Sequence, residues 1–254
     1  LFEKLNLSLS VHEVTITNNT GQYFVLDAID IDDTGRLLHP FLNEVTSLKD
    51  MQIGDCISCE YTASSGTFGT FANLGSATKD FIPASSSATP NGSFYFIHTG
   101  YDHLGRMKLV ADRNLQYSIS WDKLNEAGLC GEKEIQIDNK DLHMRLLSGG
   151  VSATDKDNEW DKIIAEYSLN GAITAGDDTI WNWRPISSWT SSTPTISTAN
   201  RTIRGYSSVI TRFDNYSSSS SSTTRGFRPV LLATPSLYFS IVSFTDKTYN
   251  QDID

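Results

Sequence analysis

The strongest hydrophobic pattern in the chain lies between residues 155 and 167. Asp155 or Asp157 is a suitable N-cap residue at its start. Large apolar residues then recur at i, i+3, i+4 and i+7, the spacing of one face of an α-helix. These residues are Trp160, Ile163, Ile164 and Tyr167. The pattern predicts an amphipathic helix whose apolar face packs on a core.

A second, shorter helix is predicted to follow Ser120. The hydroxyl of Ser120 is a favourable N-cap, and Asp122 places a negative charge in the first turn. Gly128 then acts as a typical helix stop. Both predicted helices are short, so strands and loops must make up most of the chain.

Alternating and β-branched segments predict strands. Residues 94–98 and 108–111 flank a turn at 102–106 and indicate a hairpin, and residues 226–232 form one strong apolar strand. Within residues 1–34, Leu5, Leu7 and Leu9 alternate with polar residues, and a second apolar strand follows at 23–31. Two strands alone are marginally stable, so we expect neighbours outside this segment to complete their sheet.

Loop-rich stretches divide the chain. Residues 35–92 lack helical periodicity and indicate an irregular β connector. About 40 residues before the strand at 226–232 form long loops, which in compact domains are usually functional or disordered. We therefore expect strands of an N-terminal β-sandwich at 1–34, the connector at 35–92, a domain at 93–232, and a C-terminal strand or linker at 233–254. The chain begins at Leu1 without methionine, so we expect a segment of a longer polypeptide.

Composition excludes several function classes. The 254 residues carry 20 basic and 30 acidic side chains, a net charge of −10, which argues against duplex nucleic acid as a partner. No window approaches 18 consecutive apolar residues, so no membrane span is predicted. Cys56, Cys59 and Cys130 are an odd number without a second ligand pair at zinc spacing, and a structural role is favoured over a redox or metal role.

Three further motifs are interpreted as structural. The acidic sequence at 30–35 opens like a calcium loop, but Phe41 occupies the position of the bidentate acid, so an acidic turn is favoured. Asp177 and Asp178 are likewise interpreted as an acidic turn and not as a cation site. The five histidines are scattered, without the neighbours of a metal site or a triad. No cofactor and no metal are predicted.

The distribution of charge singles out residues 184–232. This stretch holds six arginines and one acid, Asp214, which gives about +5 against about −15 for the rest of the chain. Such a region attracts anionic or hydroxyl-rich ligands, because arginine donates paired hydrogen bonds to carboxylate and phosphate. The alternative is that the arginines brace loops by donating to backbone carbonyls. We favour bracing for Arg204 and Arg228, and less so for Arg184 and Arg212.

Aromatic and hydroxyl side chains in the same stretch complete a candidate ligand site. Trp189, Tyr206 and Tyr216 are suited to stacking on sugar faces. The serine run at 217–222 indicates a loop that tolerates variation. The predicted ligand-binding residues are Arg184, Trp189, Tyr206, Arg212, Asp214, Tyr216 and Arg225.

Four motifs in order resemble those of C-type-lectin-like domains, in the branch that includes formylglycine-generating enzymes and the variable proteins of diversity-generating retroelements. They are Asn158-Glu159-Trp160-Asp161-Lys162, Trp181-Asn182-Trp183, Arg204-Gly205 and Gly226-Phe227-Arg228-Pro229. The resemblance implies an α+β fold: a C-type-lectin-like domain with two short helices and long loops, preceded by a β-rich segment that completes a β-sandwich. It does not extend to the enzymatic cysteines, since no cysteine follows Cys130, nor to the Glu-Pro-Asn calcium signature.

The same combination resembles distal modules of tail fibres and receptor-binding proteins from phages of Gram-positive bacteria. It implies a binding protein of the virion tail or another extracellular structure, which recognises a bacterial surface glycan or wall polymer through loops 184–224. Other fibre subunits are the second kind of partner expected, in a homo-oligomer such as a trimer. No nucleic acid and no membrane partner are expected.

Two alternatives stay open. A bacterial surface or secreted adhesin would use the same module. A polysaccharide-degrading enzyme would need two carboxylates about 5 to 9 Å apart, and no spacing in the sequence singles out a pair among Asp155, Asp157, Asp177, Asp178 and Asp214.

Overall fold

A computed structural model of the chain describes residues 42–234. The chain divides into two compact units, Leu1–Leu37 and Leu38–Asp254, and the described residues belong to the second. The predicted β-sandwich strands at 1–34, the acidic turn at 30–35 and all but the first two residues of the C-terminal strand or linker at 233–254 lie outside the described residues.

The second unit is mainly β, which corrects the α+β, C-type-lectin-like fold class expected from the resemblance. Strands account for 33% of the structure and helices for 10%. The predicted helices form but are short, and the segments interpreted as irregular connector and loops contribute strands. The two sheets, and not a helical layer, define the fold.

A seven-stranded, nearly closed, barrel-like sheet forms the larger part of the unit. The predicted hairpin is confirmed, because β3 and β4 pair antiparallel around the turn at 102–106. The connector predicted at 35–92 contains two strands of this same sheet. In spatial order the strands are β2 (Thr70–Ala72), β1 (Cys56–Thr62), β3 (Asn91–Tyr101), β4 (Met107–Ala111), β12 (Pro229–Ala233), β7 (Lys140–Leu146) and β6 (Lys133–Ile137).

A tight turn brings the two edges of this sheet together. Asp138 and Asn139 join β6 to β7 with φ angles of 49° and 62°, the left-handed conformation that two-residue hairpins favour. The Asp138 carboxylate accepts hydrogen bonds from the backbone N–H groups of Asn73 and Leu74, at 3.0 and 2.6 Å, just after β2. The edge strands β6 and β2 are thereby linked through a single side chain.

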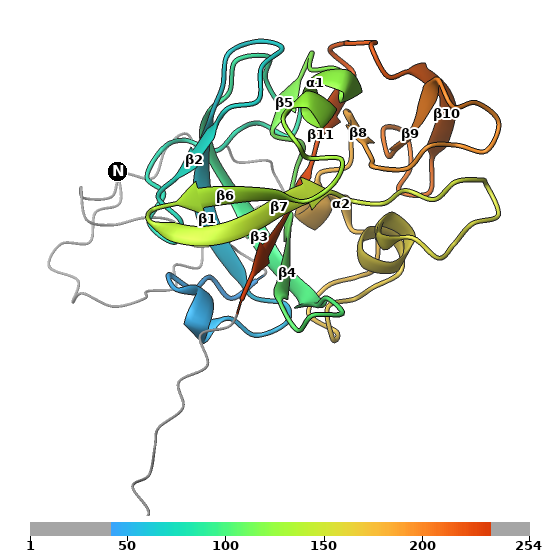
Figure 1. The fold of residues 1–254 in the computed structure, drawn as a ribbon. Coiled ribbons are helices and arrows are strands. Elements are labelled where there is room, and N and C mark those ends of the chain that lie inside the picture. The colour runs from blue at the N-terminus through green and yellow to red at the C-terminus, as the bar shows by residue number, and fades with distance from the viewer. Residues whose placement is uncertain (1–41, 235–254) are drawn as a thin grey trace, which may run out of the picture. The chain divides into compact units, whose positions relative to one another are not determined.

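A five-stranded sheet carries most of the predicted ligand loops. Its strands β8, β9 and β10 lie together in the orange part of the ribbon in Figure 1. In spatial order the sheet contains β10 (Arg212–Ser217), β9 (Asn200–Arg204), β8 (Ser187–Trp189), β11 (Arg225–Phe227) and β5 (Gln116–Tyr117).

The apolar segment at 226–232, predicted as one strand, is divided between the two sheets. β11 pairs with β8 and β5 in the smaller sheet, whereas β12 pairs with β4 and β7 in the larger one. Arg228 lies between them and is fully buried. Pro229 follows it, and proline at the first residue of a strand is tolerated because no ladder N–H is needed there.

Four short helical segments connect the strands, and two of them match the predicted helices. α1 (Trp121–Glu126) begins after Ser120, whose hydroxyl accepts a hydrogen bond from the backbone N–H of Lys123. η2 (Trp160–Ala165) is a six-residue π-helix in which Trp160, Ile163 and Ile164 are buried as the pattern predicted. Tyr167, the fourth residue of the predicted stripe, lies beyond the end of the helix and is half-buried. η1 (Leu48–Asp50) and α2 (Asp178–Trp181) were not predicted. No described helix is long and apolar enough to cross a membrane.

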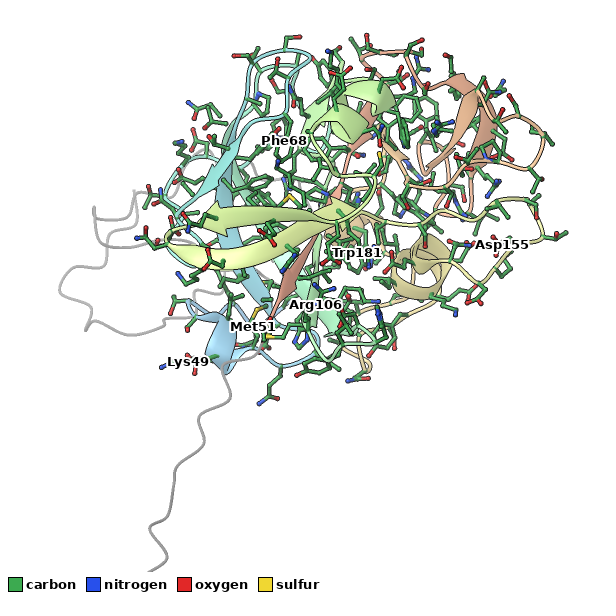
Figure 2. All side chains as sticks on the ribbon, in the orientation of Figure 1. Lys49, Met51, Phe68, Arg106, Asp155 and Trp181 are labelled. Atoms are coloured by element: carbon green, nitrogen blue, oxygen red, sulfur yellow. The ribbon has the colours of Figure 1, made fainter. Side chains whose placement is uncertain are left out.

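The capping of η2 differs from the prediction. Neither Asp155 nor Asp157 caps it; instead the side-chain oxygen of Asn158 accepts a hydrogen bond from the backbone N–H of Asp161 at 3.0 Å. The Asp155 carboxylate accepts from the N–H groups of Val151 and Asp157 and braces the preceding loop. In Figure 2 Asp155 lies at the outer end of this loop, whereas Trp181 lies in the interior.

Aromatic side chains dominate the core. Tyr61, Phe71 and Phe94 of the larger sheet pack in a row, and Tyr61 also contacts Phe227 of the smaller sheet, with ring centroids 5.8 Å apart. A second buried cluster surrounds Trp160 and Trp181. The two sheets therefore share one interior, and the loops of the smaller sheet rest on it.

Candidate functional site

The four motifs that suggested the resemblance build a buried frame beneath the loops. The Asp161 carboxylate accepts hydrogen bonds from the Arg204 guanidinium at 2.5 and 3.0 Å, and both side chains are at most 2% exposed. Burial alone would raise the pKa of Asp161, but the bonds from Arg204 and Asn158 hold the pKa of this carboxyl below its usual range. This ion pair joins η2 to β9.

Arg228 is the second buried support. Its guanidinium donates to the carbonyl oxygens of Ala111, Trp181 and Asn182, at 2.7, 2.6 and 3.2 Å. Burial lowers the pKa of Arg228. The bracing interpretation that we favoured for Arg204 and Arg228 agrees with these contacts.

Arg212 also braces the loops, although the sequence analysis favoured a ligand-binding role for it. Its guanidinium forms a two-point ion pair with Asp214, at 2.7 and 2.8 Å, and also donates to the Gly149 carbonyl at 2.9 Å. Only 9% of the Arg212 side chain is exposed. The Arg212 guanidinium and the Asp214 carboxylate are therefore paired with each other, and little of either side chain faces solvent.

Arg225 and Tyr216 form another internal pair. The Arg225 guanidinium lies 4.3 Å from the Tyr216 ring centroid and donates to the Ser220 hydroxyl at 2.8 Å. Arg225 is 9% exposed. The pair covers the edge of the core and is not a projecting cluster.

Trp189 has no face available to a ligand, which corrects its assignment as a stacking platform. It is 1% exposed, and its indole N–H donates to the Ile119 carbonyl at 3.0 Å. All three residues of β8 are buried, and Trp189 lies in the core with Arg225 and Ile203 nearby.

The serine run at 217–222 is hydrogen bonded along its backbone. The N–H of Ser218 donates to the Ala199 carbonyl at 3.2 Å, and the carbonyls of Ser218 and Ser222 accept from the N–H groups of Asp122 and Ser118, each at 3.0 Å. The run thus attaches to the first turn of α1. These main-chain bonds do not depend on the side chains, although the hydroxyls of Ser217, Ser220 and Ser222 also form hydrogen bonds.

Arg184 and Tyr206 are the two predicted site residues that are clearly exposed. The Arg184 side chain is 58% exposed and its guanidinium lies 4.8 Å from the Trp183 ring centroid. Tyr206 is 40% exposed, and its backbone N–H donates to the Trp183 carbonyl at 2.9 Å. The two residues are thereby held next to each other along the main chain.

The loop at 205–211 that carries Tyr206 is fixed from below. The Trp160 indole N–H donates to the Val209 carbonyl at 2.7 Å, and the N–H of Gly205 donates to the Thr211 carbonyl at 3.0 Å. Ile210 in the same loop is 66% exposed. A rigid support therefore presents an aromatic and an apolar side chain to solvent.

Tyr206 adopts a strained backbone conformation. Its φ angle is +90°, a region that bulky L residues rarely occupy and that costs about 1 to 3 kcal/mol. Strain of this kind persists only where the surrounding structure fixes it, and it concentrates at functional sites. We define the Arg184–Tyr206 surface as Asp178, Trp183, Arg184, Tyr206 and Ile210.

Asp178 belongs to this surface, although the sequence analysis treated it only as part of an acidic turn. One carboxylate oxygen accepts a hydrogen bond from the Arg184 backbone N–H at 3.1 Å, and the other lies 3.9 Å from the Arg184 guanidinium. The side chain is 34% exposed. Asp177 caps α2 by accepting from the Thr179 N–H, so the acidic pair begins a helix.

Most of the guanidinium groups that give this stretch its positive charge form internal hydrogen bonds or ion pairs. Arg204 and Arg212 each pair with a carboxylate, and Arg228 and Arg201 donate to backbone carbonyls. Of the six arginines in residues 184–232, Arg184 is exposed and the other five are buried or half-buried.

The remaining candidate chemistry occupies structural positions. The Cys56 and Cys59 side chains are buried in β1, and burial raises the pKa of the Cys130 thiol to about 12. No group of three metal-ligating side chains occurs within residues 42–234. Asp157 pairs with Lys162, so each of the five aspartates considered for polymer cleavage has a local partner.

Two shallow hollows lie away from the predicted ligand-binding residues. One, of about 460 Å³, is lined by the β6–β7 hairpin, including Ile135 and His143. The other, of about 330 Å³, lies between Phe68 and the Lys123–Glu126 side of α1. Neither contains a predicted ligand-binding residue.

His98 is a buried histidine with a testable pH effect. It is 0% exposed, and burial lowers its pKa below the ordinary 6.5. A lowered folded-state pKa means that stability is complete above 6.5 and is lost as the pH falls through the folded-state pKa. We expect denaturant unfolding to show this loss as the pH falls below the ordinary 6.5 of an unfolded histidine, and a smaller loss in His98→Gln. The control His143→Gln removes a partly exposed ring beside Glu132 and should retain the loss; an unchanged pH dependence in His98→Gln would contradict the assignment.

Comparison of the chain with protein-family models, curated proteins and solved structures finds no match.

Proposed function

We propose that this chain is a binding module that recognises a bacterial surface polymer through the Arg184–Tyr206 surface. The single observation that carries the proposal is the strained and exposed Tyr206 on a loop that two tryptophans hold from below. An exposed aromatic residue whose backbone is bonded to the residue before Arg184 offers contact area at low entropic cost, as in other paratope-like surfaces.

The arrangement of the frame supports this function. Buried ion pairs and carbonyl contacts consume Arg204, Arg212 and Arg228, so these residues hold the loops in place. The exposed side chains then meet a ligand without first being ordered, which reduces the cost of binding. Ligand-reading loops on a rigid β scaffold are a common arrangement.

The wider assignment rests on the order of the sequence motifs. It makes the chain a segment of a phage or prophage tail fibre or receptor-binding protein, with other fibre subunits as partners. Its ligand would be a glycan or wall polymer of Gram-positive cells.

The substitution Tyr206→Gly tests the site without confusing binding with folding. Glycine accepts the positive φ angle at no steric cost, which offsets the lost ring contacts, so the free energy of unfolding should stay within about 1 kcal/mol of wild type. Binding to intact Gram-positive cells and to purified cell walls, measured by pull-down, should be lost.

The matched control is Tyr101→Ala. Tyr101 is 53% exposed at the end of β3, far along the chain from the proposed site, and its removal should leave cell binding unchanged. Failure of the wild-type protein to bind any cell wall, or wild-type binding by Tyr206→Gly, would overturn the proposal.

A further inference from the structure

The geometry points to Asp178 as a ligand acceptor and to an uncharged sugar with two adjacent hydroxyl groups as the ligand class. This inference rests on the proposed function of the Arg184–Tyr206 surface. It concerns a residue that the sequence did not select as a binding residue.

Asp178 is fixed in position, and one of its two carboxylate oxygens is available to a ligand. It lies in the first turn of α2, and its Oδ1 accepts the Arg184 backbone N–H at 3.1 Å. Its Oδ2 lies 3.9 Å from Arg184 Nε, too far for a good hydrogen bond. Because 34% of the side chain is exposed, Oδ2 can accept a hydrogen bond from a ligand.

Arg184 supplies the complementary donors. Its guanidinium stacks on Trp183, which orients the planar group while 58% of the side chain is exposed. The Asp178 carboxylate accepts hydrogen bonds and the Arg184 guanidinium donates them, and the two groups are less than 4 Å apart. Two adjacent hydroxyl groups of a sugar suit this pair, because each hydroxyl both donates and accepts. The Tyr206 ring provides an aromatic face of the kind on which a sugar ring packs.

The charges on this surface favour an uncharged ligand over an anionic one. Asp178 sets a negative charge beside Arg184, so a carboxylate or phosphate bound to Arg184 would be repelled at close range. Arg204 and Arg212 are already paired with carboxylates. The chain as a whole carries −10, which adds long-range repulsion of an anionic polymer.

The experiment compares binding to purified Gram-positive cell walls before and after mild periodate oxidation, which cleaves the carbon–carbon bond between adjacent hydroxyl groups. Wild-type protein should bind untreated walls and lose binding after oxidation. Because no net charge pairing is needed, binding should change less than about threefold when NaCl is raised from about 0.05 to about 0.5 M. Binding that survives periodate, or that falls more than about tenfold with salt, would overturn the inference.

Substitutions locate the acceptor. Asp178→Asn keeps the oxygen that accepts the Arg184 N–H but weakens the acceptor toward the ligand, and its affinity should fall about tenfold. Asp157→Asn, an exposed aspartate paired with Lys162, is the matched control and should bind as wild type does. Unchanged or tighter binding by Asp178→Asn would overturn the assignment of Asp178.

The two proposals fail in different ways. If walls bind and Tyr206→Gly abolishes binding, but binding is salt-sensitive and resists periodate, the site stands and the uncharged-sugar inference fails. If untreated walls are not bound at all, the proposed function fails and this inference fails with it.

Discussion

Replacing Asp161 with alanine should lower the free energy of unfolding by about 3 to 5 kcal/mol, the cost of removing one partner from a buried ion pair. The Arg204 guanidinium would stay buried with its charge uncompensated, because its remaining contact is the Gly149 carbonyl at 3.0 Å. Asn158 would also lose an acceptor, since its side-chain N–H donates to Asp161 at 2.7 Å. The substitution removes the link between η2 and β9.

Urea unfolding followed by intrinsic tryptophan fluorescence measures this loss. The control is Asp157→Ala, which removes an 86% exposed carboxylate near the same helix and should leave the unfolding midpoint unchanged. A double substitution, Asp161→Ala with Arg204→Met, should recover much of the loss, because neither charge is then left unpaired. Equal midpoints for Asp161→Ala and Asp157→Ala would show that the buried pair contributes nothing to stability.

Replacing Arg228 with methionine should be comparably costly, at about 3 kcal/mol or more. Methionine fills most of the volume but cannot donate, so the carbonyl oxygens of Ala111, Trp181 and Asn182 lose their donor. In the wild-type protein the Arg228 guanidinium connects the end of β4 to α2, at the point where the chain passes from β11 to β12.

Thermal unfolding followed by circular dichroism tests this prediction. Arg228→Lys separates charge from geometry, because lysine keeps the charge but lacks the planar fork and should also be destabilising. Arg184→Met serves as the exposed control and should change the melting temperature little. A melting temperature for Arg228→Met equal to that of wild type would contradict the proposed bracing role.

Local sequence signals predicted the elements that depend on local interactions. The β3–β4 hairpin and α1 formed because a turn and a cap are encoded within a few residues, as at Ser120. The same holds for the buried stripe of Trp160, Ile163 and Ile164. The β6–β7 hairpin was missed, although Asp138-Asn139 is the signal that should have located it.

The two sheets were not predictable in this way because their pairings are distant in sequence. β12 pairs with β4 across more than a hundred residues, as in the register of Val230 with Val110. β5 and β11 contain only two and three residues, and pattern alone does not distinguish strands that short from loops. The α+β expectation was therefore wrong, since residues 35–92 and the stretch before residue 226 were interpreted as connector and loops, whereas both contain strands of the two sheets.

The candidate site shows the same division. Arg184 and Tyr206 were selected by residue type, and their exposure is compatible with a ligand role. Trp189 was selected for the same reason, but it lies on an inner strand, β8, whose residues are all buried. Asp178 was overlooked because its significance arises from its distance to Arg184, which no sequence spacing encodes.

The division of residues 225–233 between two sheets has a consequence for biosynthesis. β11 is an inner strand of the smaller sheet, between β8 and β5, and β12 is an inner strand of the larger sheet, between β4 and β7. Until these residues leave the ribosome, each sheet lacks an internal member and its remaining strands cannot join. Both sheets are therefore completed late and together, and a nascent chain that stops before residue 225 leaves the neighbours of β11 and β12 with unpaired edges.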